Sequence, residues 1–314
     1  MRNQSHRPVK GHPIADRIVS RRNTGSEAIP MLTFLQQQFA DMPRTRLKSM
    51  LRYGHIRIAG IEEVRHDTPV EPEATVEVNL ARPFITFSHP RLKLVYEDND
   101  ILVVNKGYGL LSMGTPSSRK DVTAYSVLKD YVKSINPLNK VFIVHRLDRD
   151  TSGLMMFARN MEAKEAMQHN WNNMVLERKY VAVVEGVMEE DSGVVRSYLD
   201  ETSQYEVYST HEKGKGQLAV TRYKVLERGH GYTLVEFSLD TGRKNQIRVH
   251  AHDLGHPIVG DRKYGAASSP IHRLALHART LRFAHPVSRR DMRFELPVPA
   301  RFTALLKGNI KKTI

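Results

Sequence analysis

The sequence predicts an α+β fold, in which a small N-terminal α/β domain precedes a large domain on a mixed, largely antiparallel sheet with flanking helices. Before residue 80, apolar residues recur mostly at helical spacing. From residue 91 onward, short apolar runs with strand alternation outnumber helical segments. Residues 81–90 contain two prolines and no helical pattern. We therefore expect a small domain at 31–80, a linker at 81–90 and a large domain at 91–314.

The first thirty residues are rich in Arg, Asn, Ser, Gly and Pro, without a periodic apolar signal. This composition predicts a flexible basic arm at 1–30. The arm lacks the apolar core of a secretory signal, and no apolar run approaches the roughly 18 residues that span a bilayer. Together with the absence of cysteine, this favours a cytoplasmic protein without a membrane partner. Nothing in the sequence specifies an oligomer, so a monomer is the default expectation.

The small domain is expected to open with two short amphipathic helices. Their apolar positions share one face of each helix: Leu32, Leu35 and Phe39, then Leu47, Met50 and Leu51. Three cations stand four residues apart on another face of the second helix: Arg44, Lys48 and Arg52. They fit either a solvated helix face or a phosphate-binding surface. Ile56 and Ile58 alternate with Arg57, which predicts a strand.

The large domain begins with a predicted β-hairpin, because Leu92–Tyr96 and Ile101–Asn105 flank the turn "EDND". Asn160 is placed to cap a helix. Further strands are predicted from apolar patterns at 142–144, 154–158, 179–184, 219–228 and 232–239. The last two are joined by "GHG", which predicts another hairpin.

The charge balance indicates a polyanionic partner. Lys and Arg total 48 against 34 Asp and Glu, giving a formal net charge of +14. Nucleic acid is the commonest partner of so basic a chain, although a merely soluble basic surface is the alternative. The lack of cysteine excludes disulfides, thiolate nucleophiles and cysteine-ligated zinc.

The stretch from Val144 to Arg159, "VHRLDRDTSGLMMFAR", concentrates charge between two apolar strands. Two arginines and two aspartates within five residues exceed what a turn requires. An adjacent arginine lowers an aspartate pKa by about 1–3 units, so Asp148 should stay ionised. An ionised carboxylate can act as a nucleophile or a base. The alternative is a surface ion pair between Arg146 and Asp148, worth at most about 1 kcal/mol.

The same stretch resembles the signature of the RluA-type pseudouridine synthases. Other family features recur around it: "VYEDNDILVVNK" before it, "ERKYVAVVEG" after it, then "TGRKNQIRVHAHDLGHPIVGDRKYG" and "RLALHA". The resemblance therefore covers nearly the whole chain. It implies an isomerase that converts chosen uridines of structured RNA to pseudouridine, with no cofactor and no metal.

The resemblance assigns Asp148 as the catalytic carboxylate. It would act as a nucleophile at carbon 1′ of the ribose or as a base at carbon 2′, and the sequence leaves both open. The resemblance also places Tyr180 against the target base. A base pulled from its stack needs a new stacking partner, and an aromatic ring supplies about 1–3 kcal/mol.

Arg248 matches the family arginine that pairs with the catalytic aspartate. Leu276 corresponds to the apolar residue that lines the family's site, with Leu274 as the competing assignment. His145 and Arg146 belong to the signature and are expected to contact RNA.

The N-terminal segment is similar to the RNA-binding domain first known from ribosomal protein S-four, through its helix pair and "LRYGHIRIAG". That resemblance implies that Arg44, Lys48 and Arg52 contact RNA. Large-subunit ribosomal RNA is the commonest target of family members with such a domain, and transfer RNA is the alternative. The chain departs from the family at Asn245, commonly His, and at Gly107-Tyr108, within a commonly "KPxG" motif.

Two other functions compete with this interpretation. One is an RNA-binding or ribosome-assembly protein without catalytic activity, for which the two departures would be signs of erosion. The other is a metal-dependent hydrolase using His250, His252 and His256. No acidic residue with a known metal-site spacing accompanies these histidines, so we expect no metal.

Overall fold

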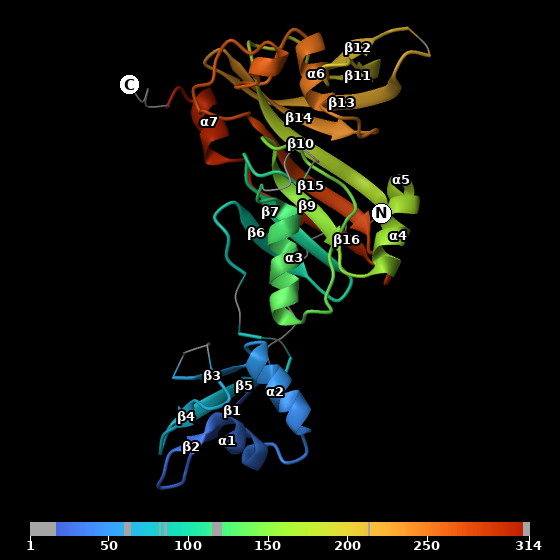
Figure 1. Cartoon of the computed structure of the whole chain (residues 1–314). Helices are drawn as coiled ribbons and strands as arrows, with labels where there is room; N and C mark the ends of the chain where they lie inside the picture. The colour runs from blue at the N-terminus through green and yellow to red at the C-terminus, as the bar shows by residue number, and fades with distance from the viewer. Residues whose placement is uncertain are drawn as a thin grey trace, which may run out of the picture.

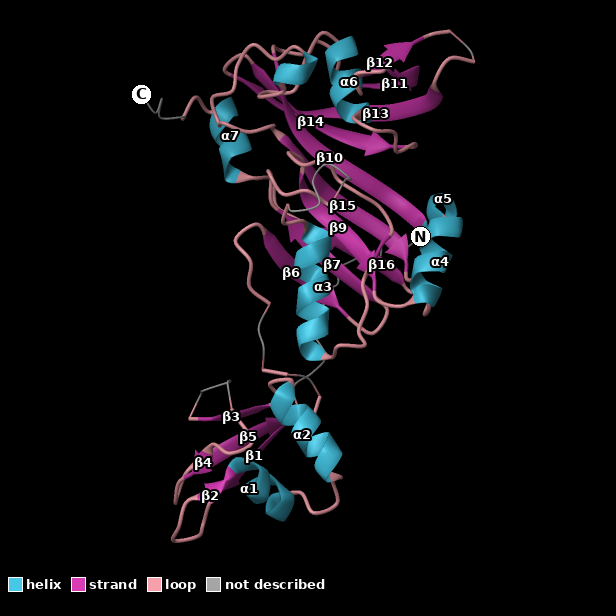
Figure 2. Ribbon diagram, viewed as in Figure 1, coloured by secondary structure: helices cyan, strands magenta, loops and turns pink. Residues whose placement is uncertain are grey.

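The computed structural model describes residues 17–59, 64–81, 83–84, 87–114, 121–212 and 214–309, with its elements labelled in Figure 1. Strands form most of the regular structure, and helices lie against them (Figure 2). A three-stranded sheet and a two-stranded pair precede residue 80, and an 11-stranded sheet follows from residue 92. The predicted α+β class with a mixed, largely antiparallel sheet is confirmed.

The N-terminal segment has its own apolar core. Helices α1 (Met31–Gln38) and α2 (Arg44–Arg52) pack against the sheet β1 (Ile18–Arg22), β5 (Thr75–Asn79) and β3 (Ile56–Ile58). Its buried apolar residues all come from within this segment, among them Met31, Phe34, Leu35, Leu47, Ile56 and Val76. Both predicted helices and the strand after them are confirmed.

Two strands correct the prediction that residues 1–30 form a flexible basic arm. Strand β1 pairs antiparallel with β5, and β2 (Ile29–Pro30) pairs with β4 (Pro69–Val70). Strand β1 escapes prediction because it is an edge strand, "IVSRR", whose side chains are largely exposed. Its pairing comes from main-chain hydrogen bonds, which leave no apolar periodicity in the sequence. Residues 1–16 of the expected arm lie outside the described residues.

The large sheet follows the order β12-β11-β13-β14-β10-β15-β9-β7-β6, with β16 added to β15 and β8 added to β9. Its strands are β6 (Leu92–Glu97), β7 (Ile101–Lys106), β8 (Phe142–Ile143), β9 (Ser152–Ala158), β10 (Val175–Glu185), β11 (Ser192–Glu201), β12 (Val207–Thr210), β13 (Gln217–Gly229), β14 (Tyr232–Leu239), β15 (Leu276–Ala284) and β16 (Asp291–Glu295). Among these, only β15 and β9 pair in parallel. The short parallel contact joins the two halves of the sheet.

Helices cover the sheet on both faces. Helix α3 (Ala124–Ile135) packs against residues of β9 such as Met155, whereas α4 (Met161–His169) and α5 (Trp171–Met174) pack against their neighbours on the other face, such as Met156. Helices α6 (Gln246–Asp253) and α7 (Ala300–Leu306) pack on the half of the sheet that contains β10 and β14. None of the helices in these described ranges is long and apolar enough to cross a membrane.

Several local predictions are confirmed. Strands β6 and β7 form the expected hairpin, whose turn is held by Asp98 Oδ1 accepting the N–H groups of Asp100 and Ile101 at 2.8 Å each. Asn160 caps α4, with its Oδ1 accepting the N–H of Ala163 at 2.8 Å. The other predicted strands fall within β9, β10, β13 and β14, and the one predicted at 142–144 corresponds to β8, which ends one residue earlier.

The described residues of the expected linker at 81–90 contain no helix or strand. Phe84 nevertheless is buried. Its N–H donates to the Gly54 carbonyl at 2.7 Å, and the Arg57 guanidinium lies 4.2 Å from its ring centroid. The start of this connection therefore packs against the N-terminal segment.

Candidate active site

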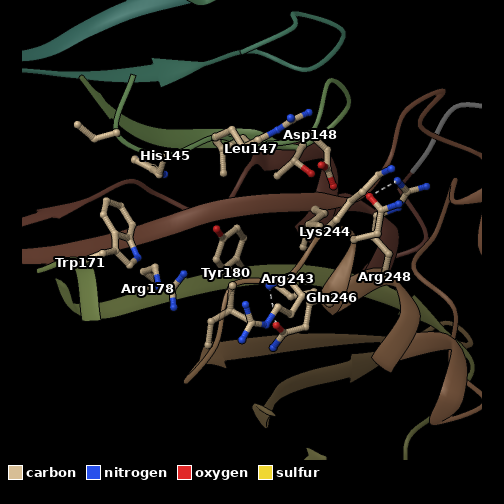
Figure 3. Close-up of a pocket in the computed structure, with 18 residues that line it drawn as sticks. His145, Leu147, Asp148, Trp171, Arg178, Tyr180, Arg243, Lys244, Gln246 and Arg248 are labelled. Atoms are coloured by element: carbon tan, nitrogen blue, oxygen red, sulfur yellow. Dashed lines mark hydrogen bonds between the residues drawn. The ribbon is translucent and has the colours of Figure 1, made fainter. Parts of the chain in front are cut away.

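A cavity of about 360 Å³ opens beside the middle of the large sheet. Three separate segments form most of its wall: the loop between β8 and β9, strand β10, and the approach to α6 (Figure 3). Six residues singled out in the sequence line it together: Asp148, Tyr180, Arg248, Leu276, His145 and Arg146.

Buried polar groups hold the loop that carries Asp148. The Ser112 hydroxyl donates to the Leu147 carbonyl at 2.6 Å and accepts the Leu147 N–H at 3.1 Å. Lys106 is fully buried, and its Nζ donates to the carbonyls of Arg149 at 3.1 Å and Leu110 at 2.8 Å. These bonds fix the main chain on either side of Asp148, so its carboxylate is presented from a rigid loop.

Burial lowers the pKa of Lys106 to about 8, against the opposing attraction of Asp150 and Asp148. The next residue explains one departure from the family. The Gly107 N–H donates to the Arg91 carbonyl at 2.7 Å, a bond that proline cannot make. A Cβ at this position would lie 3.0 Å from the same oxygen. Glycine here therefore fits the close approach of the Arg91 backbone.

Tyr180 lies in the centre of β10, between Phe237 of β14 and Ala278 of β15. Its ring faces the cavity between Asp148 and Arg178 (Figure 3). Burial raises its pKa to about 12, so the phenol stays neutral near pH 7. Because β10 is paired on both sides at Tyr180, the position of the residue is fixed, and its neutral ring is suited to stacking against a flat ligand.

His145 lines the cavity with a restricted ring. Its Nε2 accepts the Met156 N–H at 2.9 Å, which places the ring proton on Nδ1. The ring centroid lies 4.9 Å from that of Trp171. Burial, with a smaller contribution from Arg178, lowers its pKa to about 3. His145 is therefore uncharged at neutral pH and is not a source of positive charge for RNA phosphates.

The partner of Arg248 corrects the sequence-based expectation. Its guanidinium makes a bidentate contact with Asp261, Nε to Oδ2 and Nη2 to Oδ1 both at 2.6 Å, in place of Asp148. The Asp261 side chain is only 1% exposed. Asp148 still contributes to raising the pKa of Arg248, but less than Asp261 does. Asp261 could not be paired with Arg248 from the sequence, because it lies 13 residues away in an irregular turn.

Asn245 explains the second departure from the family. It precedes α6 in the left-handed region, at φ 54°, which asparagine tolerates better than most residues. Its Nδ2 donates to the Tyr264 hydroxyl at 2.9 Å, and its Oδ1 accepts from Arg248 Nη1 at 3.2 Å. The Tyr264 ring also lies 4.8 Å from the Arg248 guanidinium. Asn245 is thus part of the frame that holds Arg248.

The remaining expected residues lie in different settings. Leu276 lines the cavity, whereas its competitor Leu274 is buried in the core beside it. Arg146 is exposed at the cavity wall. The three α2 cations do not line the cavity and are exposed on the N-terminal segment: Arg44, Lys48 and Arg52.

Sequence reasoning missed part of the cavity wall. Trp171, Arg178 and Gly242 line it, but no chemical pattern in the sequence distinguishes them. Gln246 was also missed. It is buried, and its Oε1 accepts the Arg243 N–H at 2.9 Å while its Nε2 donates to the Thr221 hydroxyl at 2.8 Å.

The three histidines considered as metal ligands have separate partners. His250 lies between the hydroxyls of Thr221 at 2.8 Å and Ser197 at 3.0 Å. His252 contacts the Tyr264 carbonyl, and His256 contacts the Glu185 carbonyl. In the described part of the chain, the one group with metal-binding spacing is Asp98, Asp100 and His285, away from the cavity. This arrangement does not support the hydrolase alternative.

Comparisons with known proteins identify the family of the chain. Residues 100–253 match the RNA pseudouridylate synthase family. The chain is 34% identical to "Uncharacterized RNA pseudouridine synthase YlyB" of Bacillus subtilis (strain 168), over 89% of this chain and 93% of that protein. It is 32% identical to "Ribosomal large subunit pseudouridine synthase D" of Haemophilus influenzae, over 87% and 89% of the two chains.

A solved structure, "Human RNA Pseudouridylate Synthase Domain Containing 4", is similar with a TM-score of 0.57 and 26% identity. The similarity covers 69% of this chain and 92% of that one. The sequence similarity thus covers most of the chain, and the fold similarity covers about two thirds of it. This chain belongs to the RNA pseudouridine synthase family and is an isomerase that converts uridine to pseudouridine in RNA.

Proposed function

We propose that this enzyme modifies uridines of large-subunit ribosomal RNA. The observation that carries its chemistry is the meeting of Asp148, Tyr180 and Arg248, from three separate segments, in one cavity. The ribosomal target is supported by relatives named ribosomal large subunit pseudouridine synthase D, which match about nine-tenths of their length. The same reaction on transfer RNA is the alternative outcome of the substrate test below.

In the proposed mechanism, the target uridine is flipped into the cavity, which costs a few kcal/mol. The ribose lies at Asp148 and the uracil stacks on Tyr180, with Leu276 as an apolar neighbour. Asp148 attacks carbon 1′ or removes the proton from carbon 2′. Arg248 lies beside Asp148 in the cavity and is held in place by Asp261. The rigid loop around Asp148 supports this assignment, because a fixed carboxylate loses little entropy on reaction.

We further propose that the N-terminal segment is an S-four-type RNA-binding domain at 31–80, to which β1 and β2 add residues from 18 onward. Residues 81–90 would be the linker to the catalytic domain at 91–314. The exposed α2 cations Arg44, Lys48 and Arg52 support this function, since phosphate contacts fix position without reading bases. Replacing all three with Gln should lower the slope of log affinity against log salt by about two to three units, at about 0.7–0.9 per lost phosphate contact.

A cytoplasmic, monomeric enzyme fits this proposal. The absence of cysteine suits a reducing compartment, and ribosomal RNA is the proposed substrate. Fractionation of cells would test the compartment. Light scattering of the purified chain would test the monomer against its mass of 35.9 kDa.

Tritium release tests the reaction and its catalytic residue together. RNA labelled at carbon 5 of uracil loses that hydrogen when the base is reattached through carbon 5. Ribosomal and transfer RNA from cells lacking the protein would be supplied separately, with Asp148→Asn beside the wild type. We expect release from large-subunit ribosomal RNA by the wild type only, with RNA binding unchanged in the variant. Release by Asp148→Asn would remove Asp148 from the mechanism, and release from transfer RNA alone would replace the ribosomal target.

A further inference from the structure

Arg178 lies at the end of the cavity opposite Asp148. It precedes Tyr180 by two residues on β10, so both side chains point to the same face, about 6–7 Å apart along the strand. In Figure 3, Arg178 and Asp148 lie on either side of the Tyr180 ring.

Its guanidinium is not tied to a carboxylate by a direct contact, and Asp240 attracts it only from a longer distance. Among the residues that the structure describes, no hydrogen bond or ion pair of Arg178 is found, and its near neighbour is the Trp171 ring, 5.9 Å from Cζ to the centroid. Burial lowers its pKa, yet an arginine stays charged at neutral pH. A partly buried cation without a directly paired anion is costly, and such a group in a cavity wall is a candidate for contact with a charged ligand.

The opposite wall is shaped to admit this guanidinium. A Cβ at Gly242 would lie 2.4 Å from Arg178 Nη1, so any other residue would displace the cation. Gly242 and Arg178 come from different segments and both line the cavity. Gly242 therefore leaves room for the guanidinium at this place in the wall.

We infer that Arg178 is a further catalytic residue, which stabilises the negative charge on the uracil ring while the ring is detached from the ribose. The inference rests on the proposed placement of the ribose at Asp148 and the base on Tyr180. In that placement, the edge of the base remote from the ribose faces Arg178. A fixed guanidinium directed at oxygens that gain charge during reaction lowers the barrier, in the manner of an oxyanion hole.

The charge arises from the bond changes of the reaction. The bond between ribose carbon 1′ and uracil N1 breaks, and its electron pair stays on the ring, where it spreads to the two carbonyl oxygens. Carbon 1′ is then held by an Asp148 oxygen, or forms a double bond to carbon 2′ whose proton is on Asp148. After the ring turns, carbon 5 of the uracil bonds to carbon 1′. In the first route the bond between Asp148 and carbon 1′ breaks and its electron pair returns to the carboxylate, whereas in the second route the proton on Asp148 returns to carbon 2′. Carbon 5 then loses its proton to solvent, and N1 gains a proton.

Rate and binding measurements separate this role from a phosphate contact. Arg178→Gln, Arg178→Lys, Arg178→Ala and the wild type would be compared for single-turnover tritium release at saturating RNA. RNA affinity would be measured across a salt series. Arg196→Gln is the charge-matched control, because Arg196 is exposed on β11 and does not line the cavity. Urea unfolding followed by far-UV circular dichroism reports whether each variant folds, because the fluorescence of Trp171, 5.9 Å from the Arg178 guanidinium, would change with the substitution itself.

We expect Arg178→Gln to lower the single-turnover rate about 100-fold, as removal of an oxyanion-hole donor does, with affinity and salt slope unchanged. Arg178→Lys should keep about a tenth of the rate, and added methylguanidinium should partly restore Arg178→Ala. A wild-type rate in Arg178→Gln would overturn the inference. So would a salt slope reduced by about 0.7–0.9 at an unchanged saturated rate, which indicates a phosphate contact. If the wild type acts on transfer RNA only, the ribosomal proposal fails, and the Arg178 comparison is made on that substrate.

Discussion

Asp261→Asn should show that Arg248 depends on Asp261 for its position. The substitution keeps the size of the side chain but removes the charge that the guanidinium contacts through two bonds of 2.6 Å. Breaking one partner out of a buried ion pair costs about 3–5 kcal/mol, because the other charge stays buried. Arg248 is 16% exposed and asparagine retains one acceptor, so we expect the lower end, about 3 kcal/mol. That is a large part of the about 5–15 kcal/mol that stabilises a typical domain.

A double-mutant cycle with Arg248→Met isolates this pair. Urea unfolding of the four proteins should give a coupling energy of about 2 kcal/mol between Arg248 and Asp261. The matched cycle uses Asp148→Asn, and its coupling to Arg248 should stay below about 0.5 kcal/mol. The reasoning is refuted if Arg248 couples more strongly to Asp148 than to Asp261. That result would restore the direct pair between arginine and catalytic aspartate expected from the sequence.

Three further predictions follow from buried groups and close contacts. The pKa of Lys106 is lowered to about 8 from 10.5, so the unfolded chain binds an extra proton between these two pH values. The free energy of unfolding should therefore rise from about pH 8 to pH 10, by on the order of 3 kcal/mol. Urea unfolding of Lys106→Met should show a flatter rise. Burial lowers the pKa of His250 to about 4, so the neutral ring contributes fully to stability above pH 6.5, and this contribution is lost as the pH falls toward 4. In His250→Asn the melting temperature should therefore fall less steeply as the pH is lowered. Gly153→Ala should lower the free energy of unfolding by more than about 3 kcal/mol, since a Cβ would lie 2.2 Å from the Ala278 carbonyl oxygen. Gly231→Ala meets no atom within 4 Å and should lower it by about 1 kcal/mol. Equal urea midpoints of the two variants would contradict this.

The parts of the fold that the sequence predicts are those set by neighbouring residues. The β6–β7 hairpin follows from the polar turn "EDND", and the cap of α4 follows from Asn160. Strand β15 was not predicted as a central element, although it contacts three other strands, β10, β16 and β9. Its partners lie far away in the chain, and its sequence "LHARTLRFA" carries no sign of which strands it joins. Pairing across such distances is decided by tertiary packing.

The same distinction applies to the site. The signature around Asp148 is contiguous, so resemblance can identify it from the sequence. The partner of Arg248 is not, because Asp261 reaches it from a separate turn. Arg178 was visible only as one letter of "ERKYVAV". Its lack of a partner, and the space that Gly242 leaves for it, are properties of folded geometry.

The cations that line the cavity differ in whether they have a hydrogen-bond or ion-pair acceptor within the protein. Three of them have protein acceptors: Arg248 on Asp261, Lys244 on Glu201, and Arg243 on the Leu218 carbonyl. These contacts fix the side chains of the cavity wall, and the acceptors offset much of their positive charge. Arg146 and Arg178 have no such acceptor within the described ranges, and they lie at the rim and inside the cavity respectively. A charge that the fold leaves without a direct partner next to a cavity of about 360 Å³ acts on whatever enters the cavity. The two unpaired arginines are therefore where substitutions should change the handling of RNA with the least change in stability.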